Sequence, residues 1–230
     1  MPLVLILAEA ALELVPPEIV NHPSVVAQAK RRDKAPNGIL LDVSYHYTAM
    51  RALEQSEKRG RPDIVHFSIL QALGCPLNKE GLLRTYIHTR NDHVVEIDGA
   101  TRVPRNYDRF VSLMEQLFKE GQVPPKGRPL FQEKSSSLRE LIERIQPTML
   151  VALSTLGQPS TPEGLCIDLS GTERPAIIVG CFARGHFAAK NERLADRVVR
   201  IDKDGLDSWI VTSRVLYEYE RAIGLTEKRL

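Results

Sequence analysis

Short runs of strand-forming residues recur along the chain and predict a buried sheet. The first, Val4-Leu5-Ile6-Leu7, leads into residues 8–14, whose composition predicts the start of a helix before Pro16-Pro17. Continuous apolar strands are typical of a parallel sheet covered on both faces, in which ligands bind beyond the carboxyl ends of the strands. Three further runs of this kind, each followed by a turn or a glycine, cover residues 149–153, 176–179 and 197–201.

The hydrophobic pattern predicts a hairpin and several helices between these runs. Residues 85–89 and 94–97 fit two antiparallel strands joined by a polar turn. From Asn106, apolar residues recur with helical spacing as far as Phe118, which predicts a helix that ends near Gly121. The other expected elements are a loop at 21–38, a strand at 39–41, a helix capped by Ser44, a strand or buried helix at 63–70, a surface connection at 121–129 and a helix at 138–145.

The last helix carries an apolar stripe. Packing against the core is the favoured interpretation of this stripe, and a dimer interface is the alternative. The stripe comprises Leu206, Trp209, Ile210, Ser213, Leu216 and Tyr217.

Composition limits the class of protein. A chain of 230 residues with 43% hydrophobic content can fill its own core. No run of about 18 apolar residues and no targeting pattern at the N-terminus occurs, so we expect a cytoplasmic protein without a membrane partner. The three cysteines, Cys75, Cys166 and Cys181, are widely spaced, so we expect reduced thiols and no metal site.

Charge gives no strong indication of a partner. The 31 basic and 29 acidic residues leave a net charge of +2, so an RNA site has to come from local clustering. The six histidines are scattered, and none has a catalytic partner at a diagnostic spacing.

Arg102, Arg105 and Arg109 form one candidate cluster. On a helix, Arg105 and Arg109 project roughly opposite the apolar face that contains Leu113. Guanidinium groups bind phosphate oxygens bidentately and stack on bases, which suits RNA. On this segment alone, a solvated basic face is the favoured interpretation.

A second cluster lies at Lys58-Arg59-Gly60-Arg61-Pro62-Asp63. Asp63 is near enough in sequence to pair with Arg61 and orient it. A charged loop at the end of a helix is the favoured interpretation of this pattern alone.

Glycine-bearing turns follow three of the predicted strands, at residues 154–157, 180–185 and 202–205. Glycine lets the backbone approach a ligand closely, but turns also use it for its conformation. The dinucleotide-binding G-x-G-x-x-G motif with a downstream acid, the phosphate-binding P-loop and the G-x-S-x-G nucleophile motif are all absent from the sequence. The sequence therefore gives no motif-based reason to expect a classical dinucleotide site, a P-loop kinase or a serine hydrolase.

Read together and in order, several motifs resemble the small-subunit ribosomal RNA pseudouridine N1-methyltransferases, a family of the SPOUT, trefoil-knot superfamily. They are RGRPDI at 59–64, CPLN at 75–78, YIHT at 86–89 and RVPRNYDRF at 102–110, and their ordered combination is specific where single motifs such as RPD are not. The resemblance extends over nearly the whole chain through residues 5–14, 45–50, 180–182, 205–206 and 209.

The resemblance implies a fold and an activity. The expected fold is a single SPOUT-type α/β domain over residues 1–230, with a mainly parallel sheet, helices on both faces and a hairpin-containing insertion at about 42–110. A C-terminal trefoil knot at about 148–224 would bind S-adenosylmethionine. The expected reaction is methylation of N1 of a pseudouridine in small-subunit ribosomal RNA by a homodimer, during ribosome biogenesis with possible assembly-protein partners.

The resemblance also implies site residues. The RNA-binding set is Arg59, Arg61, Asp63, Arg102, Arg105 and Arg109, in which Asp63 orients an arginine. The cofactor-binding set is Leu153, Thr155, Gly157, Gly180, Cys181, Phe182, Gly185, Ile201, Asp202, Lys203, Asp204, Gly205 and Leu206.

The chain departs from the family pattern in one cofactor loop. Gly180-Cys181 replaces the glycine pair common before Phe182, and Ala183-Arg184 stands where a proline and a variable residue are common.

No residue declares itself as the general base, so the catalytic residues stay unassigned. Two other functions share part of the pattern. One is a ribosome-assembly factor that binds RNA, with methylation secondary or absent, and the other is a SPOUT methyltransferase that acts on transfer RNA.

Overall fold

The computed structural model describes residues 2–230, in which one eight-stranded sheet forms the centre. The strands lie in the order β4-β5-β3-β2-β1-β7-β6-β8. Their bounds are β1 Leu3–Ala10, β2 Leu83–Thr89, β3 His93–Ile97, β4 Gln122–Val123, β5 Phe131–Ser135, β6 Met149–Pro159, β7 Pro175–Gly180 and β8 Arg197–Arg200.

The sheet is mainly parallel. Strand β1 pairs in parallel with β2 and β7, and β6 pairs in parallel with β7 and β8. Strand β3 is antiparallel to β2 and β5, and β4 is antiparallel to β5. The predicted hairpin is therefore confirmed as β2–β3, and the antiparallel strands extend one edge of the parallel sheet.

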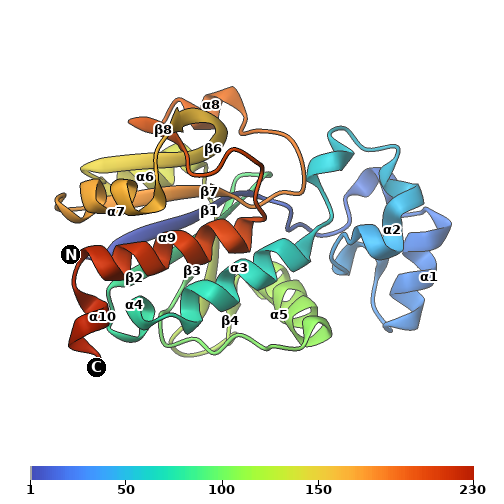
Figure 1. Ribbon diagram of the computed structural model, residues 1–230. Coiled ribbons are helices and arrows are strands. Elements are labelled where there is room, and N and C mark those ends of the chain that lie inside the picture. The colour runs from blue at the N-terminus through green and yellow to red at the C-terminus, as the bar shows by residue number, and fades with distance from the viewer. Residues whose placement is uncertain (1) are drawn as a thin grey trace.

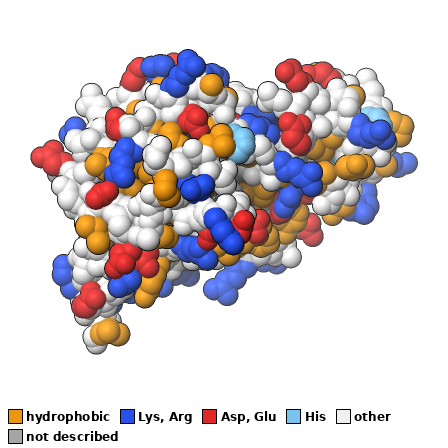
Figure 2. All heavy atoms as spheres, turned by 45° about the horizontal axis from the view of Figure 1, so that its top comes forward, with side chains coloured by type: hydrophobic (Ala, Val, Ile, Leu, Met, Phe, Trp, Pro, Cys, Tyr) orange, Lys and Arg blue, Asp and Glu red, His pale blue; other side chains and the backbone are white. Residues whose placement is uncertain are grey.

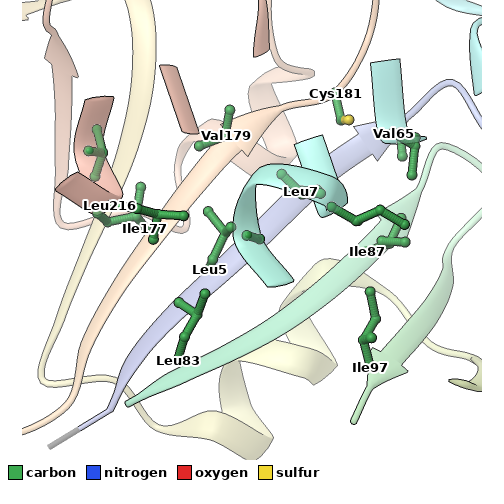
Figure 3. Packing of buried hydrophobic residues seen from close by; sticks show 14 of the residues in the cluster. Leu5, Leu7, Val65, Leu83, Ile87, Ile97, Ile177, Val179, Cys181 and Leu216 are labelled. Atoms are coloured by element: carbon green, nitrogen blue, oxygen red, sulfur yellow. The ribbon is translucent and has the colours of Figure 1, made fainter. Parts of the chain in front are cut away.

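The helices cover both faces of the sheet. Alternate residues of β1 point to opposite faces, so Leu5 and Leu7 face one layer of helices while Val4 and Ile6 face the other. Figure 3 shows Leu5 and Leu7 packed among residues of β2, β7 and α3. The first layer contains α3 (Pro62–Gly74), α5 (Tyr107–Glu120), α7 (Pro162–Ser170) and α9 (Ser208–Ala222), and the second contains α6 (Leu138–Ile145).

Helices α1 (Pro23–Arg31) and α2 (Val43–Met50) form a smaller lobe with its own apolar core (Figure 1). Its core lies within residues 15–53, so it overlaps the start of the expected insertion. The buried Glu115 of α5 fastens the lobe to the main body, because its carboxylate accepts hydrogen bonds from Arg32, Lys34 and the backbone N–H of Leu40.

Short helices complete the chain. They are α4 (Pro76–Lys79), α8 (Ala189–Glu192) and α10 (Leu225–Lys228), together with 3-10 turns at Pro17–Ile19, Pro36–Gly38 and Ser56–Lys58. No helix in residues 2–230 is long and apolar enough to cross a membrane.

Four local predictions were wrong. Residues 39–41 form no strand, and Leu40 makes only an isolated bridge with Leu14. Residues 8–10 continue β1 instead of starting a helix, because Ala8 pairs with Gly180 of β7 and Ala10 with Thr89 of β2. Helix α1 lies where a loop was expected. The cap of α2 is Asp42 rather than Ser44, since the Asp42 carboxylate accepts the Ser44 N–H.

The other strong patterns were confirmed. Helix α5 begins after its N-cap, Asn106, and ends before its C-cap, Gly121. Gly121 has a φ of 76°, in the left-handed region that favours glycine. Helix α6 matches its predicted bounds, and the ambiguous run at 63–70 is helical. The trefoil knot stays a prediction.

Candidate cofactor and RNA-binding site

A cavity of about 320 Å³ lies beside the bulge of β6 after Leu153, where β7 and β8 end. Because β7 and β8 are parallel to β6, their carboxyl ends lie level with the β6 bulge, and this bulge and the loops after β7 and β8 enclose one space. Most of its wall comes from three segments, residues 153–155, 179–187 and 199–208, with Val211 of α9 added.

Both apolar groups and polar groups form the wall. Leu153, Val179 and Phe187 supply apolar surface, whereas Ser154 and Asp202 supply polar groups. The start of α9 is fixed to the loop, because the Ser208 hydroxyl donates a hydrogen bond of 2.5 Å to the Gly180 carbonyl oxygen.

Close backbone packing shapes the cavity from outside. A Cβ at Gly157 would lie 2.5 Å from the backbone nitrogen of Val199, so only glycine lets β6 pass β8 at this point. A Cβ at Gly180 would lie 2.9 Å from the ring of Phe182, a contact that a ring movement could relieve.

Most of the predicted cofactor residues line this cavity. Three do not: Gly157 packs against β8, Lys203 is exposed, and the Cys181 side chain is buried in the core. Burial raises the pKa of the Cys181 thiol to about 12, so the thiol is inert at neutral pH. The ten that line the cavity are Leu153, Thr155, Gly180, Phe182, Gly185, Ile201, Asp202, Asp204, Gly205 and Leu206.

Glu9 anchors the loop after β7, which the sequence did not reveal. Its carboxylate is nearly buried and accepts hydrogen bonds from the Ala188 N–H at 2.7 Å and the Asn191 amide at 2.9 Å. Glu9 also adopts a φ of 50°, in the left-handed region that is unusual for a residue with a side chain. Such a conformation persists where the surroundings fix it.

Lys58 clamps the same loop. Its ammonium lies 3.3 Å from the Glu9 carboxylate, donates to the His186 carbonyl oxygen, and lies 4.7 Å from the centre of the Phe182 ring. Lys58 belongs to the basic cluster found in the sequence, but only the fold shows that this lysine serves the cavity. The segment that carries Lys58 and Arg61 thus contacts the cofactor loop directly.

Arg61 and Asp63 form the pair that the sequence predicted. The guanidinium donates two hydrogen bonds, of 2.8 and 2.7 Å, to the two carboxylate oxygens. The hydrogen bonds that Arg61 donates to the Asp63 carboxylate raise the pKa of Arg61, and the charges of Asp207 and Asp42 add to this effect. Asp207 lines the cofactor cavity, so Arg61 lies near its rim.

Arg59 departs from the expected RNA-binding set. It is 6% exposed and donates two hydrogen bonds, of 2.8 and 2.7 Å, to the buried Glu13. Because a guanidinium held in a buried ion pair cannot reach a phosphate, Arg59 is a structural residue and this part of the prediction is corrected.

Arg102, Arg105 and Arg109 have exposed side chains at and before the start of α5. Within residues 2–230 none of the three forms an ion pair, so all three guanidiniums are open to a ligand. Figure 2 shows Lys and Arg side chains gathered where the main body meets the smaller lobe. The exposed surface formed by Arg102, Arg105 and Arg109 is called the basic surface below.

Comparison with known proteins places these features in a family. The EMG1/NEP1 methyltransferase family pattern matches residues 5–220. The chain belongs to this family. It is 45% identical to the ribosomal RNA small subunit methyltransferase Nep1 of Thermococcus sibiricus, over 95% of this chain and 98% of that protein. It is also 45% identical to the Nep1 of Staphylothermus marinus, over 94% of each chain.

A solved EMG1/NEP1 structure is also similar. The crystal structure of Archaeoglobus fulgidus Nep1 bound to S-adenosylhomocysteine superposes with a TM-score of 0.87 at 38% sequence identity. The superposition covers 97% of this chain and all of that chain. The family resemblance found in the sequence and the α/β fold with its mainly parallel sheet are thereby confirmed.

Proposed function

We propose that this protein transfers a methyl group from S-adenosylmethionine to small-subunit ribosomal RNA, and that N1 of a pseudouridine receives it. The observation that carries the proposal is the cavity formed by the β6 bulge and the loops after β7 and β8, in a chain of the EMG1/NEP1 family. The Nep1 relatives are named as methyltransferases of this RNA, and one was solved with the demethylated cofactor.

The cavity fits S-adenosylmethionine in size and chemistry. A volume of about 320 Å³ lies within the range for small-molecule sites. Leu153, Val179 and Leu206 offer an apolar slot for adenine, and Ser154 and Asp202 offer polar partners for ribose. When bound, the cofactor supplies an activated methyl group on a sulfonium.

The residues of the chain would position the RNA. Arg61, oriented by Asp63 near the cavity rim, and the open guanidiniums of Arg102, Arg105 and Arg109 would hold phosphates that flank the target. Binding of these phosphates would place an unpaired base in the cavity, with its N1 in line with the methyl group of the cofactor. Both Asp63 oxygens are engaged by Arg61, so the general base for the N1 proton stays unassigned.

We also propose that the protein acts as a homodimer. The C-terminal stripe divides between two surroundings: Leu216 is buried in the core, whereas Ile210 and Tyr217 are 38% and 55% exposed. Phe67 of α3 is 44% exposed and contacts Trp209, so an apolar patch extends over two neighbouring helices. Contiguous exposed apolar surface of this kind is typical of protein interfaces.

The test uses two small-subunit RNA hairpins that differ at one loop position. One has pseudouridine and the other uridine, and each is incubated with the protein and methyl-labelled S-adenosylmethionine. We expect label only on the pseudouridine hairpin and a reduced rate for Arg105→Ala. Tight binding of both hairpin and cofactor without any transfer would overturn the proposed reaction and favour an assembly factor.

A further inference from the structure

A second cavity, of about 220 Å³, lies between the α1–α2 lobe and α5. It is separate from the cofactor cavity, with which it shares no lining residue. The family reaction needs one cofactor and one target base, and neither purpose accounts for this cavity. We propose that it binds a second unpaired base of the RNA substrate, an inference that rests on the RNA-binding part of the proposed function.

The position of the cavity links it to the basic surface. Asp108 and Ser112 line both this cavity and a shallow hollow along α5 that also includes Arg109. On the other side, Asp42 lines the cavity, and the N–H of the next residue, Val43, donates a hydrogen bond of 2.8 Å to the carbonyl oxygen of Gly60, which precedes Arg61. RNA held by Arg61 and Arg109 would therefore pass the cavity entrance.

Flat stacking surfaces stand at the entrance. The Tyr45 side chain is 41% exposed, and the guanidinium carbon of Arg31 lies 5.3 Å from the centre of its ring. Unpaired RNA bases are typically recognised by stacking on aromatic rings and guanidinium planes. Both residues line the cavity, so a base that enters meets a stacking partner there.

The wall also contains a polar group without a partner. His46 is 1% exposed, and its Nδ1 accepts a hydrogen bond of 3.1 Å from the Asp42 N–H. Burial lowers the pKa of His46, so the ring is neutral and its proton is on Nε2. Within residues 2–230 no group accepts this proton. A carbonyl oxygen of a base is an acceptor of the required kind.

The charges favour a neutral base over a phosphate. The wall has two cations, of which Arg32 is already paired with Glu115 and Arg31 lies over Tyr45. It also has two carboxylates: Asp42, which accepts the Ser44 N–H and the Tyr107 hydroxyl, and Asp108. Carboxylates repel a phosphate but accept hydrogen bonds from the amino and imino groups of a base. The cavity thus combines stacking planes with both donors and acceptors.

The test measures binding of the pseudouridine hairpin after removal of single bases. Abasic substitutions are placed one at a time at the unpaired positions that flank the target. We expect one of them to weaken binding to the wild-type protein about tenfold, which is typical of the loss of one stacked base. Tyr45→Ala should weaken binding of the intact hairpin by a similar factor and should no longer respond to that abasic substitution. Tyr45→Phe keeps the ring and should bind as the wild type does.

A second pair of variants tests the buried histidine. His46→Asn keeps an acceptor for the Asp42 N–H but removes the Nε2 donor, whereas His46→Gln keeps a donor near Nε2. We expect His46→Asn to bind the hairpin more weakly than His46→Gln. Arg139→Ala, an exposed change on α6, is the matched control and should leave binding unchanged.

The outcomes separate this inference from the proposed function. Suppose that the wild-type protein methylates the hairpin, but that Tyr45→Ala binds the hairpin normally or is weakened by the same abasic substitution as the wild type. The second base site is then wrong, and the proposed methyltransferase function is unaffected. If the wild-type protein does not bind the hairpin, the proposed substrate and this inference fail together.

Discussion

The cofactor cavity and the basic surface beside α5 differ in what forms them. The cavity is enclosed by loops that follow parallel strands, and buried contacts of Glu9 and Lys58 hold one of these loops in place. The basic surface consists of exposed side chains at the start of α5 and in the segment before it. Within residues 2–230, none of Arg102, Arg105 and Arg109 forms an ion pair with an acidic group. Backbone shape should therefore govern cofactor binding, and single side chains should govern RNA binding.

This difference predicts that the largest effect comes from backbone crowding beside the cavity. Gly157→Ala would place a methyl group 2.5 Å from the backbone of β8, so β6 and β8 must separate. We expect unfolding free energy to fall by about 3 kcal/mol, as for overpacked cores, with loss of S-adenosylhomocysteine binding. Thermal unfolding and calorimetric titration measure the two effects.

Gly171→Ala is the matched control, because its Cβ would meet its nearest neighbour at an ordinary 3.5 Å. Equal behaviour of the two variants would show that the crossing of β6 and β8 tolerates expansion.

The next effect concerns the attachment of the α1–α2 lobe. Glu115→Ala removes the acceptor shared by Arg32, Lys34 and the Leu40 N–H. We expect a loss of about 2 kcal/mol in unfolding free energy, because hydrogen bonds that involve charged groups are lost. RNA affinity should fall with it, whereas cofactor affinity should not. A selective loss of cofactor binding would contradict the separation of the two regions.

Lys58→Ala should act on the cofactor side although it lies three residues from Arg61. Loss of its contacts with Glu9, His186 and Phe182 frees the loop over the cavity. We expect about tenfold weaker binding of S-adenosylhomocysteine, because the freed loop must then be ordered when the ligand binds, which costs entropy. Lys58→Arg, which keeps a cation, should recover part of the affinity.

Lys190→Ala serves as the control for Lys58→Ala, because Lys190 pairs with Asp92 at the surface. The role assigned to Lys58 is wrong if the Lys58→Ala and Lys190→Ala proteins bind the cofactor equally well.

The smallest effect should come from one arginine of the basic surface. Arg109→Ala should weaken hairpin binding several-fold. It should also reduce the slope of log affinity against log salt concentration by about 1, the change expected for the loss of one phosphate contact. Cofactor affinity and unfolding free energy should not change, because the side chain is exposed and unpaired. Hairpin titrations at several salt concentrations provide the measurement, and an unchanged slope would remove Arg109 from the RNA surface.

The sequence predicted those features that depend on local pattern. The periodicity of α5, the helix expected at 138–145 and the apolar runs of β6 and β7 all correspond to observed elements. Residues 8–10 were misjudged because their strand conformation depends on partners at positions 89 and 180, which a local window cannot contain.

The candidate site was predictable in its location but less so in its details. The ordered family motifs located the cofactor loops, and ten of the expected residues do line the cavity. The sequence could not show which of Arg59 and Arg61 is open to RNA, since both belong to the same basic cluster. Only the fold brings Glu13 to Arg59 and leaves Arg61 near the rim. Glu9 was missed because its partners lie about 180 residues away.

Mapping of the methylated nucleotide shows whether the protein methylates N1 of a pseudouridine in ribosomal RNA. Small-subunit ribosomal RNA that contains its pseudouridines is incubated with the protein and labelled S-adenosylmethionine, digested with nucleases and analysed by mass spectrometry, with transfer RNA as the competing substrate. We expect one added methyl group, on N1 of a pseudouridine in an unpaired loop. A methyl group on transfer RNA instead, or on a base other than pseudouridine, would contradict this expectation.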